Sequence, residues 1–139
     1  MNTVRELVII GKQEVAFREV ERRALQPHEV RVRSLFGAAK HGTEMAFFKG
    51  YAAPRGGYDA EYRVYRGERE GVHYPFPAGN ICVGEVIEAG SAVTRLRLGD
   101  RVFNYGSFCQ EHVWPESVRT LPAGTPWQAA VCLDPADFA

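Results

Sequence analysis

The amino-acid sequence predicts a mainly β domain, folded as a partly open barrel with a few short helices. Apolar residues recur in many short segments with the alternation that is typical of half-buried strands. Fourteen glycines and eight prolines divide the chain at short intervals, which leaves little room for long helices. Many short strands between turn residues are typical of barrels.

The first third of the chain predicts three strands. Residues 7–10 form a short apolar strand, and residues 15–20 alternate as its hairpin partner across a turn at Gly11. Residues 29–36 alternate again, with valines on one face and arginines on the other. This pattern predicts a half-exposed antiparallel strand that carries Arg31 on its outer face.

A short helix and a long loop follow. Residues 43–49 can form two helical turns, which Gly50 ends as a cap. Residues 51–73 have no clear period, which is typical of a functional loop or a surface insertion. This segment could contain two short strands near residues 62–65. The aromatic residues of this loop either line a substrate mouth or belong to a surface insertion, and they are Tyr51, Tyr58, Tyr62, Tyr65 and Tyr74.

Residues 76–103 have the most regular pattern. One long strand covers residues 82–89, and a second short strand starts at Arg101 after a turn. Regularly spaced glycines mark bulges and tight corners, because glycine adopts positive φ at little cost. These are Gly79, Gly84, Gly90 and Gly99.

The last third predicts two strands and a helix. Residues 107–114 and 118–121 are strand segments, and residues 127–133 form a helix after Pro126. Asp134 has the character of an N-cap, so a second helix is expected to begin just before the sequence ends.

Composition and charge argue against several function classes. Seventeen basic residues balance seventeen acidic ones, so no nucleic-acid or anionic membrane partner is expected. No apolar run approaches the roughly 18 residues that span a bilayer, and the N-terminal run is too short for a signal peptide, which favours a cytoplasmic protein. Cys82, Cys109 and Cys132 form no C-x-x-C pair, which predicts buried free thiols rather than a zinc ribbon or redox motif.

Several short motifs follow one another over residues 25–139. They are the strand at residues 29–33, G-T-E at 42–44, F-P at 76–77, G-x-V-x-x-x-G at 84–90, G-D-R-V at 99–102, E-H-V-W-P at 111–115 and L-P-A-G at 121–124. In this order they resemble the catalytic domain of the medium-chain dehydrogenase/reductase superfamily, whose fold is GroES-like. The resemblance implies an NAD(P)-dependent oxidoreductase that acts on a small alcohol, polyol or carbonyl compound.

The resemblance also implies a second domain. In the family, a segment such as residues 134–139 leads into a Rossmann domain that binds the nicotinamide cofactor. This sequence contains no G-x-G-x-x-G, so residues 1–139 are expected to be an excised GroES-like domain that neither binds NAD(P)H nor oxidises alcohols alone. Such a domain would expose an apolar face that includes residues 127–138, which favours a homodimer.

The metal ligands of the zinc-dependent members are replaced. Those members place a cysteine before G-T-D and a G-H-E before the glycine strand, where this sequence has His41 and then Asn80 followed by Ile81. Asparagine binds zinc poorly and isoleucine cannot bind it, and the four-cysteine structural lobe is absent. The resemblance therefore implies a zinc-independent enzyme.

Four candidate site residues remain at the matched positions. Thr43 matches the residue that passes a proton between the substrate alcohol and the nicotinamide ribose, or else it only caps the helix. His41 could act as a general acid toward a substrate oxygen, or it is a loop histidine bonded to the backbone. Glu44 and Asn80 could bind substrate. Alternatively, Glu44 pairs with a base or stabilises the helix start, and Asn80 occupies a left-handed turn.

Two further hypotheses stay open. A stand-alone GroES-like module could bind a partner protein through residues 51–73, and a zinc enzyme could use unusual ligands. His112 stands where the family usually has an aromatic residue, so we expect it to be packed or at a strand edge rather than catalytic.

Overall fold

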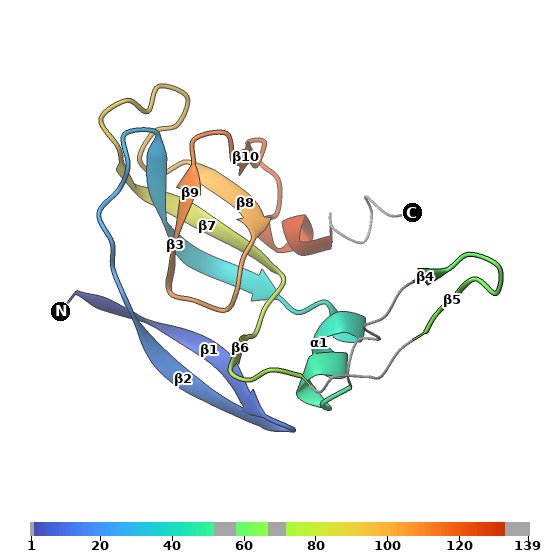
Figure 1. The fold of residues 1–139 in the computed structure, drawn as a ribbon. Coiled ribbons are helices and arrows are strands. Elements are labelled where there is room, and N and C mark those ends of the chain that lie inside the picture. The colour runs from blue at the N-terminus through green and yellow to red at the C-terminus, as the bar shows by residue number, and fades with distance from the viewer. Residues whose placement is uncertain (1, 52–57, 67–71, 133–139) are drawn as a thin grey trace.

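The structure is a computed structural model that describes residues 2–51, 58–66 and 72–132 (Figure 1). Its helical elements are α1 (His41–Phe48) and the 3₁₀ helix η1 (Trp127–Cys132). Its strands are β1 (Thr3–Gly11), β2 (Glu14–Glu21), β3 (Glu29–Ala38), β4 (Tyr58–Asp59), β5 (Val64–Tyr65), β6 (Phe76–Pro77), β7 (Ile81–Ala89), β8 (Arg101–Tyr105), β9 (Glu111–Pro115) and β10 (Arg119–Thr120).

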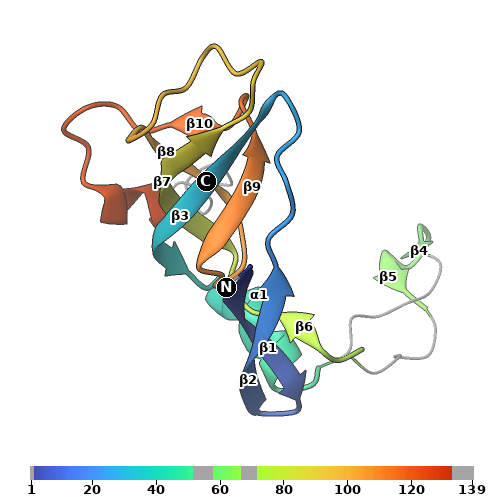
Figure 2. The same ribbon diagram turned by 90° about the vertical axis from the view of Figure 1, so that its left-hand side faces the viewer.

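An antiparallel five-stranded sheet forms the body of the domain, in the order β10-β8-β7-β3-β9. It curls around a shared interior and leaves the barrel partly open (Figures 1 and 2). β7 lies between β3 and β8, so the long strand predicted near residues 82–89 is central to the sheet. The predicted fold class, mainly β with short helices, is confirmed.

Apolar side chains cover both faces of this sheet. The inner cluster contains Val30, Val32, Cys82, Val86, Leu96, Val102, Trp114 and Val118. The outer cluster contains Ile81, Val83, Phe103 and Ala130, and Trp127 and Val131 of η1 pack against it. Because the first turns of the C-terminal segment cover the domain's own core, residues 127–132 give no support to the predicted homodimer face, and residues 133–138 lie outside the described part.

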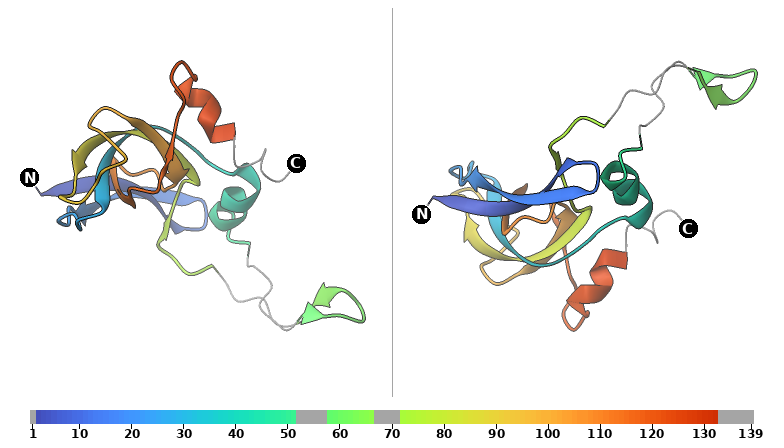
Figure 3. Two further views of the ribbon diagram at one scale, coloured as in Figure 1. Left: turned by 90° about the horizontal axis from the view of Figure 1, so that it is seen from above. Right: turned by 90° about the horizontal axis from the view of Figure 1, so that it is seen from below.

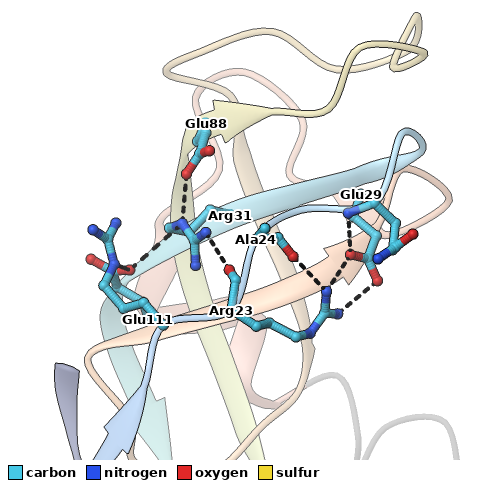
Figure 4. A network of polar contacts seen from close by, with 8 residues as sticks. Arg23, Ala24, Glu29, Arg31, Glu88 and Glu111 are labelled. Atoms are coloured by element: carbon cyan, nitrogen blue, oxygen red, sulfur yellow. Dashed lines mark hydrogen bonds and ion pairs between the residues drawn. The ribbon is translucent and has the colours of Figure 1, made fainter. Parts of the chain in front are cut away.

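Arg31 differs from the sequence prediction because it is buried, with 5% of its surface exposed. Its guanidinium Nε lies 2.6 Å from an oxygen of Glu88 and 3.9 Å from one of Glu111, and its Nη2 donates to the carbonyl of Arg23 at 2.8 Å (Figure 4). β3 has neighbours on both sides, β7 and β9, which supply Glu88 and Glu111, and the segment between β2 and β3 supplies the carbonyl of Arg23. The alternation of β3 was correct, but its second face is covered at Arg31, while Arg33 and Leu35 on that face are exposed.

The N-terminal hairpin joins the body through a loop. β1 pairs with β2 and also with β6, a short strand that the sequence analysis missed. Leu7 donates its N–H to the carbonyl of Phe108 at 2.9 Å, and Gln110 donates to that of Arg5 at 3.0 Å. The predicted strand at residues 107–114 is therefore wrong in its first half, because that half forms this crosslinking loop before β9 begins at Glu111.

The cysteines follow their prediction only in part. All three are free, but Cys82 alone is buried, Cys109 is half-buried and Cys132 is exposed. Burial raises the pKa of the Cys82 thiol, which donates to the hydroxyl of Ser34 at 3.3 Å. Cys132 ends η1 rather than lying in a core helix, which explains its exposure.

The insertion between α1 and β6 carries a two-stranded hairpin, β4–β5, that stands away from the body (Figures 1, 2 and 3). Tyr58 and Tyr65 pair across it with ring centroids 5.2 Å apart, and Arg66 lies over the ring of Tyr62 at 4.6 Å. These tyrosines are exposed, whereas Tyr74 is partly buried and donates to the carbonyl of Phe47 at 2.9 Å. The described part of the insertion fits a surface insertion better than a substrate mouth.

Neither helix of the described residues is long and apolar enough to cross a membrane.

Candidate functional site

The site is built around the N-terminus of α1. The helix begins at His41, and Lys40 is the N-cap residue without a capping side-chain hydrogen bond. Thr43 is the third helical residue, so the structure does not support the alternative that it caps the helix. The helix ends at Phe48 with Lys49 as its C-cap, and Gly50 follows with φ of 74°, the left-handed conformation expected of a glycine at this place.

A tight turn places Asn80 opposite this helix start. Gly79 has φ of 111°, and a Cβ there would lie 2.5 Å from the backbone nitrogen of Phe108, so only glycine fits. Asn80 then donates its N–H to the carbonyl of Ala38 at 3.0 Å and accepts from the N–H of Gly106 at 3.0 Å. Gly79, not Asn80, occupies the left-handed position, contrary to one predicted alternative.

Glu44 connects the helix to the turn. Its carboxylate accepts a hydrogen bond of 2.7 Å from the N–H of Gly79, and the residue is only 9% exposed. Burial raises the pKa of Glu44, and the bond from Gly79 acts in the opposite direction. Glu44 lies in the first turn of α1 as predicted, with one oxygen bonded to the protein's own backbone.

Two adjoining hollows meet at His41. The first, which we call the polar cavity, has a volume of about 220 Å³. The second, which we call the apolar groove, has a volume of about 320 Å³ and lies between α1 and the tip of the N-terminal hairpin. The polar cavity is lined by Ala38, Ala39, Lys40, His41, Asn80, Ile81 and Val131, and His41 and Ala39 also line the groove.

The structure brings some of the predicted site residues together and leaves one apart. His41 and Asn80 share the polar cavity, and Glu44 lines the apolar groove. Thr43 is exposed and lines neither hollow. The sequence did not predict that Lys40 and Val131 line the polar cavity. Lys40 could have been predicted because it directly precedes His41, whereas no signal pointed to Val131.

The polar cavity can hold an oxygen atom between two kinds of side chain. An imidazole can donate or accept a hydrogen bond and exchange a proton near neutral pH, and a side-chain amide offers both donors and an acceptor. His41 and Asn80 supply these groups at one cavity. This arrangement suits a hydroxyl or carbonyl group as ligand.

The residues at the cavity do not fit a catalytic zinc ion. Ile81, at the position of the family's glutamate, is 5% exposed and packs in the outer core cluster. Asn80 offers an amide, which is not among the usual zinc ligands, and one oxygen of Glu44 accepts a hydrogen bond from the N–H of Gly79. Across the described ranges, no three His, Cys, Asp or Glu side chains are placed to hold a metal ion.

His112 lies elsewhere, on β9. Its ring stacks on Trp114 with centroids 5.0 Å apart and an interplanar angle of 9°. Nε2 is buried without a hydrogen-bond partner in the structure, and burial lowers the pKa of the imidazole. The packed position expected from the sequence is what the structure shows.

Comparison with known proteins identifies the domain. The family model described as the alcohol dehydrogenase GroES-like domain matches residues 26–125. D-guloside 3-dehydrogenase of Escherichia coli (strain K12) is 35% identical over an alignment of 147 positions, which covers 98% of this chain and 42% of the relative. A probable cinnamyl alcohol dehydrogenase 1 of Eucalyptus gunnii is 60% identical over 30 residues, 22% of this chain and 8% of the relative.

Solved structures agree on the fold. The CAD protein of Helicobacter pylori, complexed with NADP(H), superposes with a TM-score of 0.68 at 16% identity and covers 98% of this chain and 48% of that chain. An oxidoreductase/dehydrogenase of unknown specificity from Escherichia coli gives a TM-score of 0.67 at 16% identity, covering 96% of this chain and 44% of that chain. The chain spans less than half the length of these relatives. It belongs to the alcohol dehydrogenase GroES-like domain family, as part of the medium-chain dehydrogenase superfamily.

Proposed function

We propose that this chain is the substrate-side domain of an NAD(P)-dependent dehydrogenase that oxidises a secondary hydroxyl group of a polyol or sugar derivative without zinc. The observation that carries the proposal is the polar cavity, which His41 and Asn80 both line. The similarity to D-guloside 3-dehydrogenase favours a sugar derivative among the alcohol, polyol and carbonyl substrates that the resemblance implies.

The proposed chemistry divides between this domain and a cofactor domain. Oxidation of a secondary alcohol removes a hydride from carbon and a proton from oxygen. A nicotinamide held by the cofactor domain would supply the hydride acceptor. This chain's task is to hold the hydroxyl group and accept its proton, and the reverse reaction returns that proton to the carbonyl oxygen.

His41 is the proposed proton acceptor and Asn80 the proposed hydrogen-bond partner of the substrate oxygen. An imidazole next to the hydroxyl can take the proton as the hydride leaves, which avoids an unstabilised alkoxide. Thr43 lies two residues further along α1, is exposed and lines neither hollow, so we assign it no step in the proton transfer. Glu44 holds the turn that carries Asn80.

The test is turnover by the protein expressed from its whole reading frame, with NAD⁺ and NADP⁺ and a panel of polyols and glycosides. General acid–base catalysis contributes roughly 10²- to 10⁴-fold, so His41→Gln should lower kcat by about that factor. The matched control is His28→Gln, because the His28 side chain is 71% exposed and lies beside Glu116. A wild-type rate in His41→Gln contradicts the assignment.

The proposal also predicts what the isolated 139-residue chain does. We expect it to fold but to give no heat of binding with NAD(P)H in calorimetry, because its sequence has no dinucleotide fingerprint. Measurable cofactor binding by this chain contradicts the proposal that a separate domain binds the cofactor.

A second candidate is a module that binds a partner protein through the hairpin β4–β5. The observation in its favour is the exposure of Tyr58, Tyr62 and Tyr65, at 56%, 60% and 61%. A reading frame that continues into a G-x-G-x-x-G strand-turn-helix favours the dehydrogenase, and one that stops at residue 139 favours the module.

A further inference from the structure

The apolar groove beside His41 has no role in the proton chemistry described above. Its floor is formed by Ile9 and Ala78, which are 2% and 6% exposed. Its rim is formed by Val15 and Met45, which are 52% and 41% exposed. Ligand sites are hollows of about 300–1,000 Å³ with mostly apolar walls and a few polar groups, and the groove's volume of about 320 Å³ falls in that range.

The walls of the groove are fixed to one another by backbone hydrogen bonds. At the hairpin tip, Gln13 donates its N–H to the carbonyl of Phe48, the last residue of α1, at 2.7 Å. At the floor, Ala78 donates to the carbonyl of Leu7 at 3.0 Å. Three segments distant in sequence therefore form one hollow whose shape exists before any ligand enters, which lowers the cost of binding.

The groove adjoins the polar cavity. His41 and Ala39 line both hollows. A single ligand can therefore place an oxygen near His41 and Asn80 and an apolar group between Val15 and Met45. A free sugar has no apolar group to fill the second hollow, whereas a glycoside has its aglycone.

We propose that the apolar groove binds the aglycone of the substrate, so that the enzyme acts on glycosides with an apolar aglycone in preference to free sugars or methyl glycosides. This inference rests on the proposed function for the sugar part of the ligand. Met45 and Val15 are then specificity-determining residues, because they form the exposed walls around the aglycone.

The experiment measures binding of phenyl β-D-guloside and methyl β-D-guloside to the 139-residue chain and to the protein of the whole reading frame by ligand-observed NMR and calorimetry. Burial of a phenyl ring should make the phenyl glycoside bind about 10- to 30-fold more tightly than the methyl glycoside. Met45→Lys should abolish this preference.

The matched control is Ile10→Lys. Ile10 is 47% exposed and neighbours Ile9 on β1, but successive strand residues face opposite sides, and Ile10 does not line the groove. This control should keep the phenyl preference. Circular dichroism tests whether both variants fold. If Met45→Lys does not fold, Val15→Lys takes its place.

The outcomes separate the two proposals. The groove assignment is wrong if the two glycosides bind with equal affinity, or if Ile10→Lys loses the phenyl preference as Met45→Lys does. It is also wrong if the wild-type chain dimerises with Met45 at its interface. A phenyl preference without any turnover of either glycoside supports the groove but contradicts the dehydrogenase. Turnover of both at equal kcat/KM supports the dehydrogenase and contradicts the groove.

Discussion

At the scale of single residues, Arg31 shows how a charged side chain can belong to the interior of this fold. Its side chain is 6% exposed and donates hydrogen bonds to Glu88 and to the carbonyl of Arg23. Glu88 remains 51% exposed, so one partner of the pair keeps contact with water. By contrast, Arg33, two residues along β3, is 57% exposed and lies 3.4 Å from Glu85.

The first prediction compares these two arginines. Arg31→Met keeps the apolar stem but removes the donor of the part-buried hydrogen bond to the carbonyl of Arg23 and of the bond to Glu88, so we expect a loss of about 1–3 kcal/mol in the free energy of unfolding. Arg33→Met removes an exposed ion pair and should cost about 0–1 kcal/mol. Urea denaturation of the 139-residue chain measures both, and equal losses would show that Arg31 does not have a structural role of its own.

At the scale of elements, α1 and the turn before β7 are joined through one carboxylate. Glu44 of the first helical turn accepts the N–H of Gly79, directly before Asn80. The other side of this turn is held by backbone bonds to Ala38 and Gly106. The relative position of His41 and Asn80 therefore depends on Glu44.

The second prediction separates the acceptor from the charge at Glu44. Glu44→Gln keeps an oxygen for the N–H of Gly79 and removes a buried carboxyl group, so stability should stay within about 1 kcal/mol of wild type. Glu44→Leu leaves that N–H without a partner and should cost about 1–3 kcal/mol. Thermal unfolding followed by circular dichroism distinguishes the variants, and a glutamine variant as unstable as the leucine variant contradicts this role.

The third prediction concerns β9 and pH. Burial lowers the pKa of His112 in the folded state, while the unfolded chain has the ordinary value near 6.5. The unfolded state therefore binds a proton first, and stability falls as pH drops below about 6.5 until the lower folded pKa is reached. His112→Phe keeps a ring against Trp114 and should lose less stability than wild type between neutral and mildly acidic pH.

The control for this prediction is His28→Gln, which retains His112 and should retain its acid sensitivity. Urea denaturation at two pH values gives the slope for each protein. If His112→Phe and wild type lose the same free energy on acidification, the buried imidazole is not the cause.

At the scale of the whole molecule, the sequence predicted the features that depend on neighbouring residues and missed those that depend on contacts between distant residues. The alternation of β3 and β7 and the helix before Gly50 follow from neighbouring residues, and the sequence predicted them. The burial of Arg31 depends on Glu88, 57 residues away, and local alternation carries no information on such a partner. Strand β6 was missed for the same reason, because two residues become a strand only by pairing with β1.

The glycine pattern illustrates the same limit. Gly84 was predicted to mark a bulge or corner through positive φ, but it does not have positive φ. Glycine is required there because a Cβ would lie 2.3 Å from Cγ1 of Val32 on the neighbouring strand. Of the candidate site, His41 and Asn80 were predicted by motif position. The apolar groove was not, because its walls come from three segments that only the fold brings together.

The fourth prediction follows from the side chains at the metal positions. Asn80 and the buried Ile81 stand at two of the family's metal-ligand positions, and in the proposed mechanism His41 takes the place of the metal ion. We expect the protein of the whole reading frame to purify with substoichiometric zinc.

The most direct measurement is the rate of NAD(P)⁺ reduction with a D-guloside by this protein before and after exhaustive treatment with a zinc chelator. We predict that kcat/KM is unchanged by the chelator and falls in His41→Gln. A rate that is lost on chelation and restored by stoichiometric zinc would contradict the zinc-independent mechanism.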